Sequence, residues 1–77
     1  NFKIYPNPAN NILNFQSTDN ICGVQVLDII GREVLNFAPN RKNFTIDLSD
    51  LNNEVYILKY TTDEKSFYTT KLLINRK

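Results

Sequence analysis

Two carboxylates and one thiol are the side chains of this 77-residue chain whose types and spacing could support chemistry. Asp47 and Asp50 flank Ser49, and their oxygen atoms suggest a calcium site. Calcium takes about six to eight oxygen ligands, and nothing nearby completes such a set, so a turn-capping role is favoured. Cys22 is the only cysteine, and a nucleophilic thiol would need a basic partner that the sequence does not show. We therefore expect Cys22 to be a buried thiol.

The composition argues against most other chemistries. The chain contains no histidine, which is the commonest general base and the commonest metal ligand. We predict no enzyme activity, no catalytic residues, no metal and no cofactor. Nine basic and eight acidic side chains give no electrostatic reason to expect nucleic acid or an anionic membrane as a partner. No run approaches the roughly 20 apolar residues of a transmembrane helix, so we expect no direct membrane insertion.

The elements that must position these side chains are all strands. Apolar and polar residues alternate with a period of two, and turn residues recur about every 8–12 positions, which is typical of β-sandwiches. The predicted strands are residues 2–5, 12–16, 22–27, 33–37, 43–48, 55–60 and 66–75. The sequence thus predicts an all-β fold, a small immunoglobulin-like β-sandwich of about seven short antiparallel strands.

Three residues have predicted structural roles in turns. Asp28 and Gly31 stand at the first and fourth positions of a tight hairpin turn, where Asp bonds the turn backbone and Gly accepts a positive φ. Tyr56 follows a corner closely, where immunoglobulin-like sandwiches often place a tyrosine whose hydroxyl ties the corner backbone. In the last strand Tyr68, Leu72 and Ile74 are predicted to face inward, with Leu72 and Ile74 completing the core.

Five short motifs in a fixed order resemble one known family. They are Tyr5-Pro6-Asn7-Pro8, Asp28-x-x-Gly31-Arg32-x-Val34, Ile46-Asp47-Leu48-Ser49-x-Leu51, Val55-Tyr56 and Lys71-Leu72-Leu73-Ile74. Their order and spacing resemble a type A C-terminal sorting domain of the type IX (Por) secretion system of Bacteroidetes, over about residues 2 to 77. One position departs from the family: Glu54 stands where a glycine usually precedes the corner tyrosine, which predicts a different local turn or some strain.

The resemblance implies a secretion signal, with residues 1–77 forming one sorting domain. Such a domain directs a cargo protein from the periplasm through the outer membrane, and is recognised by the type IX translocon and its shuttle proteins. A sortase-like cysteine peptidase commonly removes it, with a cut expected near Asn1. The cargo is then released or attached to the cell surface, where it can be joined to anionic lipopolysaccharide.

Two segments are candidates for the recognised surface. Lys71, Leu72, Leu73 and Ile74 form an apolar last strand followed by the basic Arg76 and Lys77, and pairing with a partner's sheet edge is possible there.

Tyr5, Pro6, Asn7 and Pro8 form a rigid extended segment, for which a structural role is favoured over docking.

The alternative function of the domain is that of a non-catalytic immunoglobulin- or fibronectin-like accessory module that binds carbohydrate or protein. That alternative predicts exposed aromatic side chains clustered on one face.

Overall fold

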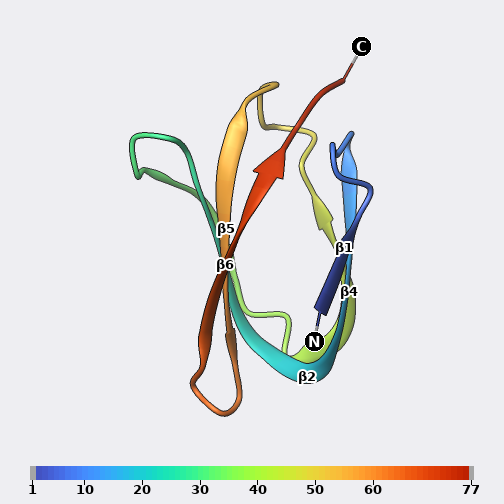
Figure 1. Cartoon of the computed structure of the whole chain (residues 1–77), viewed down its shortest axis with the longest axis vertical. Coiled ribbons are helices and arrows are strands. Elements are labelled where there is room, and N and C mark those ends of the chain that lie inside the picture. Colours follow the sequence, from blue (N-terminus) through green and yellow to red (C-terminus); the bar gives the residue numbers. More distant parts are fainter. Residues whose placement is uncertain (1, 77) are drawn as a thin grey trace.

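The computed structural model describes residues 2–76, which form six antiparallel strands and no helix (Figure 1). The strands are β1 (Phe2–Tyr5), β2 (Ile12–Leu27), β3 (Glu33–Phe37), β4 (Arg41–Asp47), β5 (Val55–Thr62) and β6 (Phe67–Leu73). The predicted all-β sandwich is confirmed. Within the described range there is no helix long and apolar enough to cross a membrane. Asn1 and Lys77, and with them the expected cut near Asn1, lie outside the described residues.

Strand β2 is the element around which both layers form. Its first half pairs with β1 on one side and with β4 on the other, whereas its second half pairs with β3 and with β5. Strand β6 extends the second layer by pairing with β5. Figure 1 shows β2 as a strongly curved ribbon that passes from one layer to the other. The sandwich therefore arises because a single long strand bends.

The predicted strands 12–16 and 22–27 are these two halves of β2, so residues 2–76 form six strands where about seven were expected. The polar residues between them remain extended at the bend and do not form a turn. The pairing of β2 with β5 shifts register between Ile21 and Gly23. An extra residue in one strand sends the following side chains to the opposite face. Accordingly the buried positions of β2 change from odd numbers to even numbers after Ile21.

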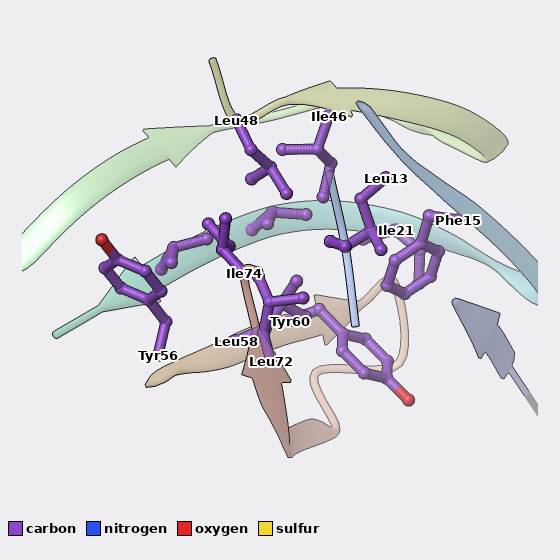
Figure 2. Packing of buried hydrophobic residues seen from close by; sticks show 13 residues of the cluster. Leu13, Phe15, Ile21, Ile46, Leu48, Tyr56, Leu58, Tyr60, Leu72 and Ile74 are labelled. Atoms are coloured by element: carbon purple, nitrogen blue, oxygen red, sulfur yellow. The ribbon is translucent and has the colours of Figure 1, made fainter. Parts of the chain in front are cut away.

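The core lies between the two layers and is almost entirely aliphatic and aromatic (Figure 2). Its buried members are Ala9, Leu13, Phe15, Ile21, Val24, Val26, Ile46, Leu48, Tyr56, Leu58, Tyr60, Leu72 and Ile74. Tyr56 and Tyr60 lie on opposite sides of the cluster in Figure 2. The thiol of Cys22 is only half-buried, and it lies 3.4 Å from the carbonyl oxygens of Thr61 and Thr62.

The strand directions define two ends of the sandwich. Residue pairs Leu27↔Ile57, Ile12↔Asp47 and Val55↔Leu73 place several connections together at one end. We call this the corner end, and it comprises residues 6–11, 28–32, 48–54 and 74–76. The opposite, bend end contains the bend of β2 at residues 17–20, the start of β1 at Phe2 and the β5–β6 turn at residues 63–66.

Candidate recognition surface

The two predicted recognition segments, far apart in the sequence, lie side by side at the corner end. The side-chain amide of Asn7 connects them. Its nitrogen donates to the carbonyl oxygen of Lys71 at 3.4 Å, and its oxygen accepts from the backbone N–H of Leu73 at 3.3 Å. An amide group used in this way occupies the place that a neighbouring strand's peptide group would take along the edge of β6. Asn7 therefore pairs with β6 through its side chain.

Ala9 continues this pairing with its backbone. Its N–H donates to the carbonyl oxygen of Leu73 at 2.7 Å, and its carbonyl oxygen accepts from the N–H of Asn75 at 3.0 Å. The bridge between Ala9 and Ile74 is parallel, and Ala9 is buried. The outer edge of β6 is thus already covered from Lys71 onward. A partner strand has no free edge there, which argues against strand addition over Lys71 to Ile74.

The four residues of the last motif divide into two pairs. Leu72 and Ile74 are fully buried in the core, as the inward-facing prediction requires. Lys71 and Leu73 point outward, and Leu73 is about one third exposed. Any contact that a partner makes with this strand therefore uses Lys71 and Leu73, while Leu72 and Ile74 act by holding the strand in place.

The segment before Ala9 is the exposed half of the same surface. Tyr5, Pro6, Asn7 and Pro8 are all exposed, and the peptide bonds Tyr5–Pro6 and Asn7–Pro8 are both cis. The ammonium group of Lys3 lies 5.5 Å from the centre of the Tyr5 ring. Because neither proline can donate a backbone hydrogen bond, the Asn7 amide provides the side-chain pairing between this segment and β6.

Arg76 fastens the end of the chain to the corner. Its guanidinium group donates to the carbonyl oxygens of Asn10 at 3.1 Å and Leu48 at 3.4 Å, and also to that of Leu51. Its backbone is held by Asn53, whose amide nitrogen donates to the Arg76 carbonyl at 2.8 Å and whose amide oxygen accepts from the Arg76 N–H at 3.1 Å. The planar fork of an arginine suits this simultaneous bonding of several carbonyl groups.

The corner itself is tied by Tyr56. Its hydroxyl donates to the carbonyl oxygen of Asn52 at 2.9 Å, which is the bond expected of a corner tyrosine. Burial raises the pKa of Tyr56, and the negative charges of Glu54 and Asp28 act in the same direction. The Asp28 turn therefore lies close enough to the corner for its charge to be felt there.

The turn between β2 and β3 is organised around Asp28. One carboxylate oxygen accepts from the N–H groups of Ile30 at 3.0 Å and Arg32 at 2.9 Å, and the other accepts from Nε of Arg32 at 2.8 Å. Gly31 has a φ of 89° and its N–H donates to the Asp28 carbonyl at 3.0 Å. Partial burial tends to raise the pKa of Asp28, but the hydrogen bonds from Arg32 and Ile30 outweigh it and lower that pKa.

Glu54 introduces no left-handed backbone into the corner. Among residues 2–76, the non-glycine residues with positive φ are Asn40 and Lys65, both elsewhere. The carbonyl oxygen of Glu54 accepts from the N–H of Ile74 at 3.0 Å, which adds another bond between the corner and the end of the chain. The strain expected at Glu54 is therefore not found, since the chain follows a path that does not need glycine.

Asp47, the last residue of β4, binds the start of the corner through its side chain. The carboxylate of Asp47 accepts from the backbone N–H of Ser49 at 2.9 Å. Hydrogen bonds from the side chain and the backbone of Ser49 lower the pKa of Asp47. No cluster of three or more His, Cys, Asp or Glu side chains that could hold a metal ion occurs among residues 2–76.

Sequence reasoning missed two residues of this surface and the main role of a third. Ala9 and Asn53 were not singled out, because a short apolar residue and a loop amide carry no distinctive signal. Arg76 was noted only as a basic residue after the last strand. The available signal was that Arg76 follows the buried Ile74 by only two residues, which keeps its side chain close to the corner.

The fold and this surface define a small β-sandwich in which two distant segments join to form one exposed face, as in a module that is recognised by a partner. Residues 3–75 match the sequence profile described as "Secretion system C-terminal sorting domain". The chain belongs to this family, the C-terminal sorting domains of the type IX secretion system. Members are secretion signals and are generally not catalytic; the domain interacts with the secretion machinery and its protein is exported. No curated protein matches the chain significantly.

Proposed function

We propose that the chain directs an attached cargo protein through the type IX outer-membrane translocon, and that the translocon or a shuttle protein binds the corner end. The observation that carries the proposal is the joining of Tyr5–Pro8 to Lys71–Ile74 by Asn7 and Ala9. A partner that contacts this joined surface detects that the N-terminal and C-terminal segments are both in place. Recognition of a folded surface of this kind would select completed domains over unfolded chains.

The decisive test uses residues 1–77 fused to the C-terminus of a periplasm-targeted fluorescent reporter in a type IX-competent bacterium. A translocon-deficient strain serves as the control. We expect reporter outside the wild-type cells and reporter trapped in the periplasm of the mutant. Reporter trapped in both strains, with the domain shown to be folded, would contradict a sorting function.

A pair of matched variants tests the surface itself. Lys71→Glu combined with Leu73→Glu changes the two outward residues of the motif, whereas Thr69→Glu changes an exposed residue two positions before them on the same strand. We expect both proteins to fold, and export of the first to fall roughly tenfold while export of the second is unchanged. Equal export of the two variants would show that Lys71 and Leu73 are not contacted. Export that survives deletion of residues 72–77 would exclude the whole last motif.

Processing is the third part of the proposal. A sortase-like cysteine peptidase removes the domain near Asn1, and the cargo is released or attached to the cell surface, where it can be joined to anionic lipopolysaccharide. This part is supported by family membership alone. The mass of the exported reporter checks it, because cleavage near Asn1 removes about 9 kDa. An exported reporter that keeps its full mass would rule out removal of the domain.

One observation favours carbohydrate binding as a second candidate function. A hollow of about 310 Å³ at the bend end is lined by Phe2, Tyr60, Tyr68, Ser17, Asp19 and Thr62. The Tyr60 and Tyr68 rings are stacked at 5.2 Å between centres, and Phe2 lies 4.8 Å from Tyr60. Phe2 and Tyr68 are partly exposed, whereas Tyr60 is buried beneath them. Exposed rings beside hydroxyl and carboxylate groups are the chemistry that holds a sugar ring, and ligand sites begin at roughly 300 Å³.

A titration followed by NMR separates this candidate from the first. The probes are maltotriose, cellotriose and the trimer of N-acetylglucosamine. Carbohydrate binding predicts saturable shifts at Ser17 and Asp19 that Tyr68→Ala removes and Phe67→Ala leaves. Phe67 is the matched control, because it is a more exposed ring on the same strand that does not line this hollow. Absence of saturable shifts with all three probes would exclude carbohydrate binding of these types at this hollow.

A further inference from the structure

The tip of the β2–β3 turn exposes two adjacent isoleucines. Ile29 is 74% exposed and Ile30 is 70% exposed, while most other exposed large apolar residues are less than half exposed. Single exposed apolar side chains are common on protein surfaces, but two neighbours at the tip of a projecting turn form a contiguous apolar knob. We call Ile29 and Ile30 the isoleucine tip. Neither side chain belongs to the core cluster.

Hydrogen bonds fix the backbone that carries the isoleucine tip. The turn that carries it is fixed by the bonds of Asp28 to Ile30, Gly31 and Arg32, and by the donation of the Asp28 N–H to the Arg32 carbonyl at 2.9 Å. A turn built only to reverse the chain needs the aspartate and the glycine, and polar residues would serve at the two central positions. Because the backbone of the turn is already fixed, binding of the two side chains by a partner costs little backbone conformational entropy, which favours a role as anchors.

The tip and the recognition surface lie at the same end of the molecule. Figure 1 shows the β2–β3 turn projecting sideways from the sandwich, in the same half along the long axis as the end of β6. The charge of Asp28 also acts on Tyr56 at the corner. One large partner could therefore contact the tip and the joined segments together.

We propose that the isoleucine tip inserts into a concave apolar pocket on a protein of the export machinery, as a second anchor beside the joined segments. The inference rests on the proposed sorting function. A convex pair of branched aliphatic side chains fits a pocket and not a flat surface. Arg32 is exposed beside the tip and binds Asp28 through Nε, which leaves its terminal nitrogens for carboxylate or carbonyl groups at the rim of the pocket.

The small apolar area of the isoleucine tip and the charges beside it argue against a lipid bilayer as its binding partner. Stable attachment to a membrane takes a larger apolar area or a cluster of basic residues. Here two aliphatic side chains stand between the carboxylates of Asp28 and Glu33, and Arg32 is the one basic residue within the turn. A protein pocket can bury these two side chains with a smaller contact area than attachment to a membrane requires.

Export of the reporter fusion tests the anchor. The variant Ile29→Ser/Ile30→Ser removes the apolar knob and keeps Asp28 and Gly31, and we expect its melting temperature to change by less than about 4 °C. We expect its extracellular fraction to fall roughly tenfold or more. Ile29→Leu/Ile30→Leu keeps an apolar tip and should be exported at more than about half of the wild-type level. Phe67→Ser removes a comparably exposed apolar side chain at the bend end and should leave export unchanged.

The outcomes distinguish the inference from the function on which it rests. Wild-type fusion that is not exported overturns both. Normal export of the wild type and of the double serine variant overturns the isoleucine tip alone, and so does an equal loss in Phe67→Ser. A membrane role is tested with vesicles of phosphatidylethanolamine and phosphatidylglycerol. The wild-type protein should not float with them, and flotation that the double serine variant abolishes would replace the protein pocket with a bilayer.

Discussion

The two ends of the sandwich differ in the balance between hydrogen bonds and ring contacts that holds them together. At the corner end, directed hydrogen bonds from Asn7, Asn53 and Arg76 join segments that are distant in the sequence, and Tyr56 adds a local bond to Asn52. At the bend end Asn20 forms two hydrogen bonds with Asp63, but β1 and β6 do not pair, and ring contacts of Phe2 and Tyr68 with Tyr60 fill the space between them.

This difference indicates which end carries a defined surface. Hydrogen bonds fix angles and distances, whereas stacked rings tolerate sliding and repacking. A translocon that serves many cargos needs a surface with the same shape in each. The corner end meets that requirement, and the bend end is the more adaptable region. If the hydrogen bonds define the corner end, their removal should cost more stability than equivalent changes at the bend end.

The largest effect is expected where the last strand enters the core. Leu72→Ala should lower the free energy of unfolding by about 2–5 kcal/mol, because it leaves a cavity at a fully buried position. Leu73→Ala, on the next residue and about one third exposed, should cost less than about 1 kcal/mol. Urea denaturation of both variants measures the difference. Similar losses would mean that the strand is not held by its inward face.

The second largest loss of stability is expected when the hydrogen bonds of Arg76 to the corner are removed. Arg76→Ala should lower the free energy of unfolding by about 1.5–3 kcal/mol, because three backbone carbonyl groups lose a charged donor. Arg76→Lys keeps the charge without the fork and should lie between Arg76→Ala and the wild type. Lys42→Ala removes an exposed cation on β4 and should change stability by less than about 0.5 kcal/mol.

Thermal or urea unfolding of the three proteins gives the comparison. A loss in Arg76→Ala no larger than in Lys42→Ala would show that the corner end does not depend on Arg76, and it would remove the main contrast between the ends.

Two buried tyrosines allow a direct comparison of the ends with the same chemical change. Tyr56→Phe removes the bond to Asn52 and should cost about 0.5–1.5 kcal/mol. Tyr60→Phe should change stability by less than about 0.5 kcal/mol, because the Tyr60 hydroxyl bonds no group within residues 2–76. Burial, with smaller contributions from Tyr68 and Asp19, raises the pKa of Tyr60 to about 12. Equal losses of unfolding free energy in Tyr56→Phe and Tyr60→Phe would contradict the greater importance of hydrogen bonds at the corner end.

Local sequence signals predicted most of the fold. The alternation in β4 and β5 fixed their faces, and the Asp28-to-Gly31 turn follows from the known preferences of aspartate and glycine. The continuity of β2 could not be predicted, because Ser17, Asp19 and Asn20 have the composition of a turn. Their extended conformation is imposed by pairing partners on both sides of the bend, which are non-local.

The candidate surface was predictable in its parts and not in its assembly. The motifs at Tyr5–Pro8 and Lys71–Ile74 are visible in the sequence, but nothing in it states that Asn7 pairs with Lys71 and Leu73. Tyr68 faces inward as its position in the alternation requires, yet it is 46% exposed because the sandwich is open at the bend end. The two-residue alternation of a strand predicts which way a side chain points. Its exposure depends on whether the opposite layer extends far enough to cover it.

The smallest expected effect is an acid-side loss of stability that originates at the corner end. The pKa of Asp28 is lower in the folded chain than in the unfolded chain, so Asp28 stabilises the fold above the unfolded pKa, and this contribution is lost as the pH falls through the folded value. The loss begins as the pH falls toward the ordinary pKa of an aspartate, about 4, and continues below it. Asp47 acts with the same sign.

Asp28→Asn should therefore flatten the acid branch of a stability-versus-pH profile measured by urea denaturation, and a further Asp47→Asn change should flatten it more. A profile that keeps its slope in the double variant would place the acid sensitivity outside the corner end. It would then weaken the argument that charged hydrogen bonds, more than ring packing, define that end.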